Sequence, residues 1–149
     1  MKPDSVAPDS VLYLDSNALA PLFVEEANSA EVARLVGQFS KIVVSSIAYA
    51  EVCRVFARAH FEGALDDQGF EAAVSEFDRT WKAQINVIGL SYSVSVLARD
   101  LLRAHQPHLR AMDAIHLACA LRVRQDVPLR FLTFDERLKI VSDALIPFS

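Results

Sequence analysis

Cysteine, glycine and long apolar runs are all scarce in this chain of 149 residues. Its two cysteines, Cys53 and Cys119, are too far apart to form a short-spaced metal or redox pair, so we expect reduced thiols. No apolar run approaches the roughly 20 residues that span a bilayer. The first residues also lack the basic-then-apolar order of a signal peptide. We therefore expect a cytoplasmic protein without a membrane segment.

A surplus of positive charge is also missing, because 15 basic residues stand against 19 acidic ones and the net charge is −4. This balance argues against generic coating of nucleic acid, which relies on Lys and Arg replacing the counterions of phosphate. It leaves open a nuclease whose bound metal ions supply positive charge at the site. Hydrophobic residues make up 52% of the sequence, which predicts a compact globular chain with apolar surface available to a partner.

Residues 1–10 are polar, contain two prolines and repeat the tetrapeptide Pro-Asp-Ser-Val, so we interpret them as a flexible leader. The remaining residues, 11–149, have the length of one domain. Short apolar runs within it are typical of parallel strands covered on both faces. They lie at residues 11–14, 41–44, 85–88 and 129–134, with 145–148 as a short edge strand.

Helical patterns fill the intervals between these runs. One of them carries Phe70, Val74, Phe77 and Trp81 at helical spacing, which indicates core or a dimer face. Alternating strands and helices predict an α/β fold: a three-layer α/β/α sandwich around a central parallel sheet of about five strands.

The first apolar run ends directly in Asp15, Ser16 and Asn17. In a parallel sheet, the carboxyl ends of the strands form the edge where ligands bind. The alternative is that one of these residues merely caps the helix that follows, since Asp, Ser and Asn are all favoured N-caps. The same arrangement returns when a later apolar run ends at Thr133 and Asp135. There, a capping box from Thr133 to Glu136 is the alternative.

Two further acids begin helices that start at the same edge. Glu51 borders the apolar stripe of its helix, where it needs a cation or hydrogen-bond donors to stay charged; Arg54 and Arg58 are candidate ion-pair partners. Asp113 opens a helix that is apolar nearly all round. His116 follows one turn later, and we interpret it as a buried histidine satisfied by a hydrogen bond, outside the site.

Four carboxylates therefore converge from distant parts of the sequence: Asp15, Glu51, Asp113 and Asp135. Clustered carboxylates raise one another's pKa unless a cation neutralises them. Oxygen ligands favour hard divalent ions, so Mg²⁺ is the expected occupant and Mn²⁺ a possible one. Such an ion can activate water for attack on a phosphodiester.

The chain resembles the PIN-domain ribonucleases, and in particular the VapC-like toxins of bacterial toxin–antitoxin pairs. The resemblance rests on four segments in family order: residues 14–19, 50–52, 112–118 and 132–138. It implies a Mg²⁺-dependent endoribonuclease in which the four acids bind the metal. It also implies that three small polar residues orient water or phosphate: Ser16, Asn17 and Thr133. A five-stranded sheet, a homodimer and a cognate antitoxin that covers the acidic groove follow from the same resemblance.

Two other functions fit parts of this pattern. A receiver-like module also binds Mg²⁺ at strand ends, but it needs a phosphoacceptor Asp after a mid-chain strand, and neither the run at 41–44 nor that at 85–88 ends in one. A catalytically silent member would act only through its protein partner. The presence of all four acids favours the nuclease over both.

Overall fold

The structure of the chain is a computed structural model that describes residues 6–148. Residues 1–5, half of the predicted leader, and residue 149 lie outside the described part. In the remainder of the leader, Val6 is half-buried, Ser10 is buried, and the N–H of Ser10 donates to the carbonyl of Ala7 at 2.9 Å.

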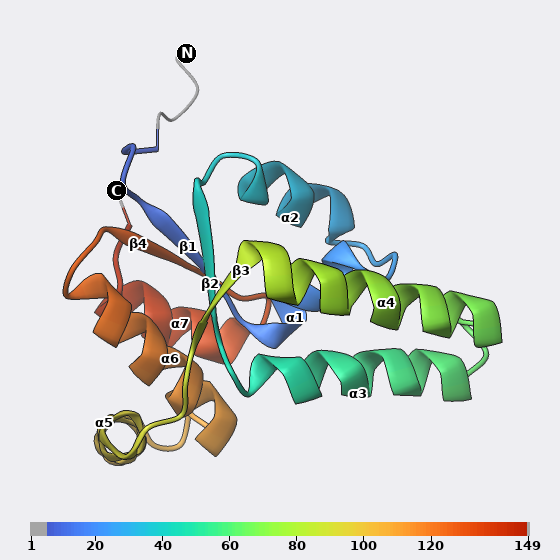
Figure 1. The fold of residues 1–149 in the computed structure, drawn as a ribbon. Helices are drawn as coiled ribbons and strands as arrows, with labels where there is room; N and C mark the ends of the chain where they lie inside the picture. Colours follow the sequence, from blue (N-terminus) through green and yellow to red (C-terminus); the bar gives the residue numbers. More distant parts are fainter. Residues whose placement is uncertain (1–5, 149) are drawn as a thin grey trace.

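Four parallel strands form the sheet of the described chain, in the order β3-β2-β1-β4 (Figure 1). Their bounds are β1 Val11–Leu14, β2 Lys41–Ser45, β3 Ile85–Ile88 and β4 Leu129–Leu132. β1 lies between β2 and β4, with Val11 opposite Lys41 on one side and Leu129 on the other. All residues of β1 are buried, as its continuous apolar run predicts.

The prediction of a fifth strand at residues 145–148 is wrong. Helix α7, Glu136–Leu145, extends into this region, and the N–H of Ile146 donates to the carbonyl of Ser142 at 2.7 Å. Ile146 is buried against the core, and Pro147 has no N–H to donate to a neighbouring strand. In the described chain β4 is therefore an edge strand, and the sheet has four strands rather than about five.

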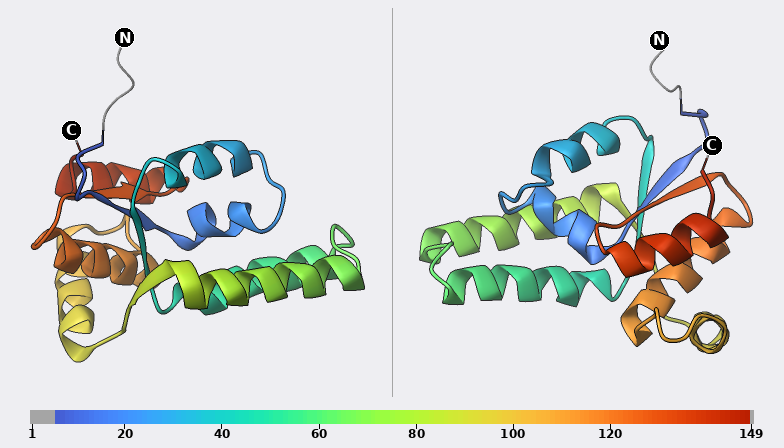
Figure 2. Two further views of the ribbon diagram at one scale, coloured as in Figure 1. Left: turned by 45° about the horizontal axis from the view of Figure 1, so that its top comes forward. Right: turned by 180° about the vertical axis from the view of Figure 1, so that it is seen from behind.

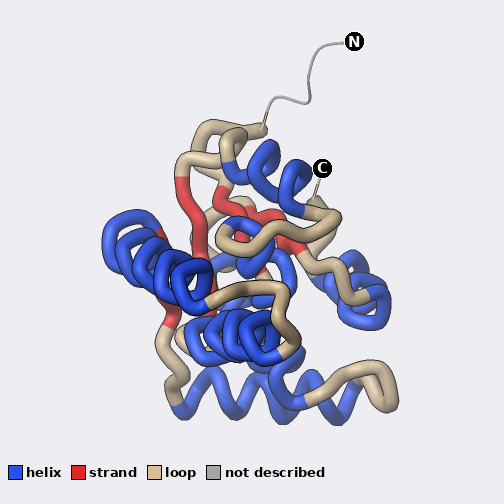
Figure 3. Tube along the Cα trace, turned by 90° about the vertical axis from the view of Figure 1, so that its right-hand side faces the viewer, coloured by secondary structure: helices blue, strands red, loops and turns tan. Residues whose placement is uncertain are grey.

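Helices cover both faces of the sheet, which confirms the three-layer α/β/α prediction (Figures 1 and 2). One layer contains α1 Ser16–Leu19, the short 3-10 turn η1 Ala20–Leu22, α2 Ser29–Val36, α3 Ala48–Phe61 and α4 Asp67–Gln84. The other contains α5 Tyr92–Ala104, α6 Ala111–Arg124 and α7. Figure 3 shows the strands with helices on either side.

Successive residues of β1 point into the two layers in turn, as strand geometry requires. Val11 and Tyr13 belong to the core on the α5–α7 side, whereas Leu12 and Leu14 belong to the core on the α1–α4 side. The strand that leads into the candidate site is thus packed on both faces.

Helices α3 and α4 form a hairpin that extends beyond the sheet (Figures 1 and 2). Gly63 follows the end of α3 with a φ of 81°, the left-handed conformation that glycine adopts without steric cost. The side chain of Asp66 then caps α4 by accepting a hydrogen bond from the N–H of Gly69 at 2.7 Å. Although α4 has 18 residues, no helix of the described chain has the length and apolar character needed to cross a membrane.

The aromatic stripe of α4 is core. Phe77 is 0% exposed and its ring packs against Phe56, Tyr49 and Trp81, with centroid separations of 5.7, 5.2 and 5.6 Å. This cluster holds α3 against α4. Because α3 carries Glu51 in its first turn, the cluster also fixes the helix that brings this acid to the sheet edge.

We predict that Phe77→Ala lowers the free energy of unfolding by about 3–5 kcal/mol, because it removes a fully buried ring and leaves a cavity. Urea denaturation followed by circular dichroism measures the change. Glu76→Ala, an exposed neighbour on the same helix, serves as the control and should stay within about 0.5 kcal/mol of wild type. Equal stability of the two variants would contradict the central packing role of Phe77.

Candidate active site

The four acids predicted for the site come from four different elements. Asp15 directly follows β1 and Asp135 caps α7 after β4, whereas Glu51 and Asp113 lie in the first turns of α3 and α6. Parallel strands end at a common edge of the sheet, and the helices that carry or follow these acids begin at that edge. Some of the acids are close enough for their charges to interact. Besides burial, the charge of Glu51 raises the pKa of Asp15, and the charges of Asp15 and Asp135 raise the pKa of Asp113.

Asp15 is the most deeply buried of the four acids, with 4% of its surface exposed. Its Oδ1 accepts a hydrogen bond from the N–H of Ser16 at 2.7 Å, and its Oδ2 accepts one from the hydroxyl of Thr133 at 2.9 Å. Asp15 is also the N-cap of α1. The structure thus shows the capping role that the sequence offered as an alternative, and it places the same side chain at the edge where the predicted acids gather.

Thr133 joins the ends of β1 and β4. Besides donating to Asp15, its hydroxyl accepts a hydrogen bond from the N–H of Asp135 at 3.1 Å. Asn17 makes a second link, because its Oδ1 accepts from the N–H of Phe134 at 3.0 Å. Thr133 is therefore not the N-cap of α7, a role that Asp135 takes.

Asp135 and Asp113 each accept hydrogen bonds from backbone N–H groups at the start of a helix. Oδ1 of Asp135 accepts from the N–H groups of Arg137 and Leu138 at 2.9 and 3.1 Å. Oδ2 of Asp113 accepts from the N–H of Arg110 at 3.2 Å, which closes the first turn of α6. The helix N-terminus also favours a negative charge at each position.

Glu51 has a different partner from those predicted. Arg58 pairs with Glu62 at 2.9 Å on the surface of α3, while Oε1 of Glu51 lies 2.7 Å from Nε2 of His116. The same Nε2 lies 3.3 Å from Oδ1 of Asp15. His116 is buried and hydrogen-bonded as predicted, but the structure brings it into contact with two of the four acids.

Burial is the main cause that raises the pKa of Asp15, and the charge of Glu51 raises it further. Burial also raises the pKa of Asp113, to which the charges of Asp15 and Asp135 add. For Asp15, the charge of His116 and hydrogen bonds from Thr133 and Ser16 offset part of this rise. For Asp113, the N–H and the charge of Arg110 do the same. Neighbouring acids therefore disfavour the ionisation of Asp15 and Asp113, and a cation beside these two carboxyls would relieve the repulsion.

The donor set fits a hard divalent cation in its chemistry. Within the described residues, Oε2 of Glu51, Oδ1 of Asp113 and Oδ2 of Asp135 make no protein hydrogen bond and keep their lone pairs. No three His, Cys, Asp or Glu side chains of residues 6–148 surround one point as ligands of an ion. Mg²⁺ is usually bound through one or two carboxylates and keeps several waters, so it does not require such an enclosure.

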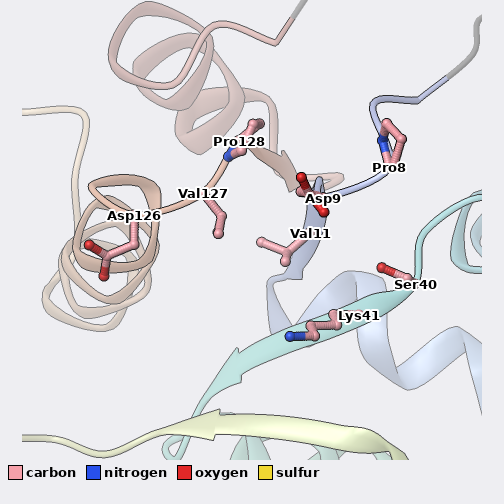
Figure 4. Close-up of a pocket in the computed structure, with 8 residues that line it drawn as sticks. All are labelled: Pro8, Asp9, Val11, Ser40, Lys41, Asp126, Val127 and Pro128. Atoms are coloured by element: carbon pink, nitrogen blue, oxygen red, sulfur yellow. The ribbon is translucent and has the colours of Figure 1, made fainter.

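A pocket of about 310 Å³ lies elsewhere, at the starts of the strands rather than at their carboxyl ends (Figure 4). It is lined by the segment before β1, the start of β2 and the loop before β4: Pro8, Asp9, Val11, Ser40, Lys41, Asp126, Val127 and Pro128. None of the predicted site residues lines it. The acids instead lie at the opposite edge of the sheet.

His116 is the residue that the sequence analysis left outside the site. A signal was available, because His116 follows Asp113 by three positions and such residues share one face of a helix. Because Asp113 was predicted to lie at the carboxyl edge of the sheet, His116 on the same helix face could be expected to lie near that edge too. The hydroxyl of Tyr13 lies 2.8 Å from Nδ1 of His116. Its sequence position gave no such signal, since an aromatic residue in a buried strand is ordinary core.

Comparisons with known proteins give matches over most of the chain. A model of the PIN domain matches residues 12–144. Ribonuclease VapC46 of Mycobacterium tuberculosis is 33% identical over 136 residues, which cover 91% of this chain and 93% of that protein.

Two solved structures share the fold. VapC20 of Mycobacterium tuberculosis, described as a sarcin–ricin loop cleaving toxin, has a TM-score of 0.65 and 16% identity, with 87% of this chain and 94% of that chain covered. A chain of a toxin–antitoxin complex from Klebsiella pneumoniae has a TM-score of 0.60 and 22% identity, with 86% and 89% covered.

We predict that Asp113→Asn raises the free energy of unfolding of the metal-free protein at pH 7, because it removes a charge that burial and neighbouring acids disfavour. Asparagine retains an oxygen that can accept from Arg110. The folded pKa of Asp113 lies above the unfolded value of about 3.9, so the folded state holds the proton more tightly. The stabilising contribution of this carboxyl is therefore complete below the unfolded pKa and is lost as the pH rises through the folded pKa.

Urea denaturation in the presence of a chelator at neutral and acidic pH tests this prediction. The advantage of Asp113→Asn should shrink as the pH falls, because the wild-type carboxyl is then neutral too. Asp143→Asn, at the exposed far end of α7, is the matched control and should change stability by no more than about 0.5 kcal/mol. A variant that is less stable than wild type at pH 7 would contradict the repulsion inferred for Asp113.

Proposed function

The chain belongs to the PIN-domain family, and from this membership we propose that it is an endoribonuclease that hydrolyses RNA with a divalent cation, Mg²⁺ or Mn²⁺. We assign the cation to the four acids at the carboxyl edge of the sheet: Asp15, Glu51, Asp113 and Asp135. We assign the orientation of water or phosphate to the small polar residues beside them: Ser16, Asn17 and Thr133.

One observation carries this proposal: Asp15 is buried beside Glu51, and the pKa values of Asp15 and Asp113 are raised first by burial and then by the charges of neighbouring acids. Such an arrangement lowers the stability of the empty protein, and it is expected where function requires a bound cation. Helix capping explains the places of Asp15, Asp113 and Asp135 but not that of Glu51, which caps no helix. Relatives that are named ribonucleases support the same conclusion.

When bound, the cation supplies positive charge at the scissile phosphate and makes a water molecule more acidic. The protein residues supply position and proton acceptance. Ser16 and Thr133 hold both oxygens of Asp15, so this carboxylate keeps a fixed orientation. Oδ1 of Asp113 is free of protein donors in the described chain, and the raised pKa suits it to accept the proton that an attacking water releases.

We propose further that the chain is the toxin of a toxin–antitoxin pair and that its cognate antitoxin covers the acidic edge. Its structural neighbour from Klebsiella pneumoniae belongs to a toxin–antitoxin complex. Basic groups of an antitoxin would find unpaired carboxylate oxygens at this edge. Binding there would block RNA without changing the fold.

We expect the protein to form a homodimer through apolar helix surface. Large apolar side chains are exposed on its helices, among them Tyr92 at 85% on α5 and Ile140 at 68% on α7. Burying such surface is the main driving force for stable association. Sedimentation velocity at micromolar concentration should therefore show a dimer. A pure monomer under these conditions would contradict the expectation.

We predict that Asp15→Asn reduces RNA cleavage at least about 100-fold, because several kcal/mol of charge stabilisation are lost with this carboxylate. Total cellular RNA should be incubated with wild type and variant, with Mg²⁺ and with chelator, and new 5′ ends mapped by sequencing. Discrete cuts are expected from wild type with Mg²⁺. Their sequences also identify the substrate.

Asp143→Asn, an exposed acid far along α7, should cut like wild type. Circular dichroism should show that Asp15→Asn remains folded. Unaltered cleavage by Asp15→Asn would overturn the site assignment. An absence of cuts by wild type with any divalent ion would instead favour a catalytically silent member that acts through its protein partner.

A further inference from the structure

We propose that His116 is a positioning residue whose imidazole, anchored by Tyr13, holds Glu51 beside Asp15 in the arrangement that receives the divalent cation. The inference rests on the proposed metal-dependent nuclease and adds a residue to its site. It starts from a hydrogen-bond chain that runs through both layers of the protein.

The imidazole of His116 is 1% exposed, and both of its nitrogens have partners. Nδ1 lies 2.8 Å from the hydroxyl of Tyr13 in β1. Nε2 lies 2.7 Å from Oε1 of Glu51 in α3 and 3.3 Å from Oδ1 of Asp15. One buried ring thus contacts a strand, the end of that strand and a helix from the opposite layer.

The acceptors fix the proton on this ring. An ionised carboxylate can only accept hydrogen bonds, so Nε2 must carry the hydrogen that faces Glu51 and Asp15. Burial raises the pKa of the Tyr13 hydroxyl well above its usual value, so this phenol keeps its hydrogen at neutral pH and can share a hydrogen bond with Nδ1. His116 therefore donates to Glu51 through Nε2, and the hydroxyl of Tyr13 is the hydrogen-bond partner of Nδ1.

With Glu51 held by His116 in this way, its second carboxylate oxygen is available to a cation. Glu51 is held through Oε1, while Oε2 has no protein donor in the described chain and can face an ion. The side chain of Glu51 is 24% exposed and would otherwise sample several rotamers. Hydrogen bonds that orient ligating carboxylates commonly contribute 10–100-fold to metal affinity, so we expect an effect of about this size.

His116→Leu tests the proposal, because leucine fills much of the ring's space without a hydrogen-bond donor. Isothermal titration with Mn²⁺ in the absence of RNA should show affinity weakened about 10–100-fold. His116→Gln retains an N–H at the end of a side chain of similar reach and should restore most of the affinity. His60→Leu, the same change at an exposed histidine that pairs with Asp67 at the α3–α4 turn, is the matched control and should bind Mn²⁺ like wild type.

Tyr13→Phe provides a second test that preserves the core, since it removes only the hydroxyl. It should weaken Mn²⁺ binding in the same direction as His116→Leu, with thermal unfolding used to verify that each variant is folded. If His116→Leu does not fold, the comparison of Tyr13→Phe and His116→Gln with wild type decides the question. Wild-type Mn²⁺ affinity in folded His116→Leu, or in Tyr13→Phe, would overturn the positioning role.

The metal-free protein offers a readout that does not depend on activity. Nitrogen-15 NMR of the His116 side chain should show a hydrogen on Nε2, and Tyr13→Phe should shift the Nδ1 resonance. A ring protonated on Nδ1 alone would contradict the chain. Failure of wild type to bind Mn²⁺ or cut RNA would count against the proposed function, whereas normal wild-type behaviour with insensitive variants would count against His116 alone.

Discussion

Burial of the Asp15 carboxylate is the constraint around which this molecule is arranged. A charge in the protein interior is costly unless hydrogen-bond donors or a cation compensate for lost water. Here the N–H of Ser16 and the hydroxyl of Thr133 provide part of the compensation, and His116 approaches from a third side. The central position of β1 keeps these groups fixed, because pairing on both sides leaves its end no freedom to move.

The sheet edge also explains why acids from opposite layers can meet. Glu51 belongs to a helix on one face of the sheet, and Asp113 belongs to a helix on the other. Within the sheet the strands separate these layers, so side chains from α3 and α6 can approach each other only beyond the strand ends. His116 makes this connection directly, since it lies in α6 and contacts Glu51 in α3.

The sequence was sufficient to predict the strands that matter and the acids that follow them. β1 is a continuous apolar run, and β2 has an apolar run at residues 42–44, so both strands could be recognised from local sequence. The absence of a strand at residues 145–148 could not be predicted, because Leu145 and Ile146 are equally compatible with a strand and with a helix end, and their packing against the core decides between the two. The hydrogen-bond partner of Glu51 could not be predicted from local sequence either. Spacing within the helix favoured Arg54 or Arg58, whereas His116 lies 65 positions away.

The joining of β1 to β4 has a consequence for the order in which the protein becomes active during synthesis. The strand that ends in Asp15 is made first, yet its carboxylate depends on the hydroxyl of Thr133, which the ribosome adds more than a hundred residues later. A nascent chain that stops short of this segment has neither β4 beside β1 nor Asp135 at the edge. The edge of the sheet beside Asp15 is therefore complete only when nearly all of the messenger RNA has been translated.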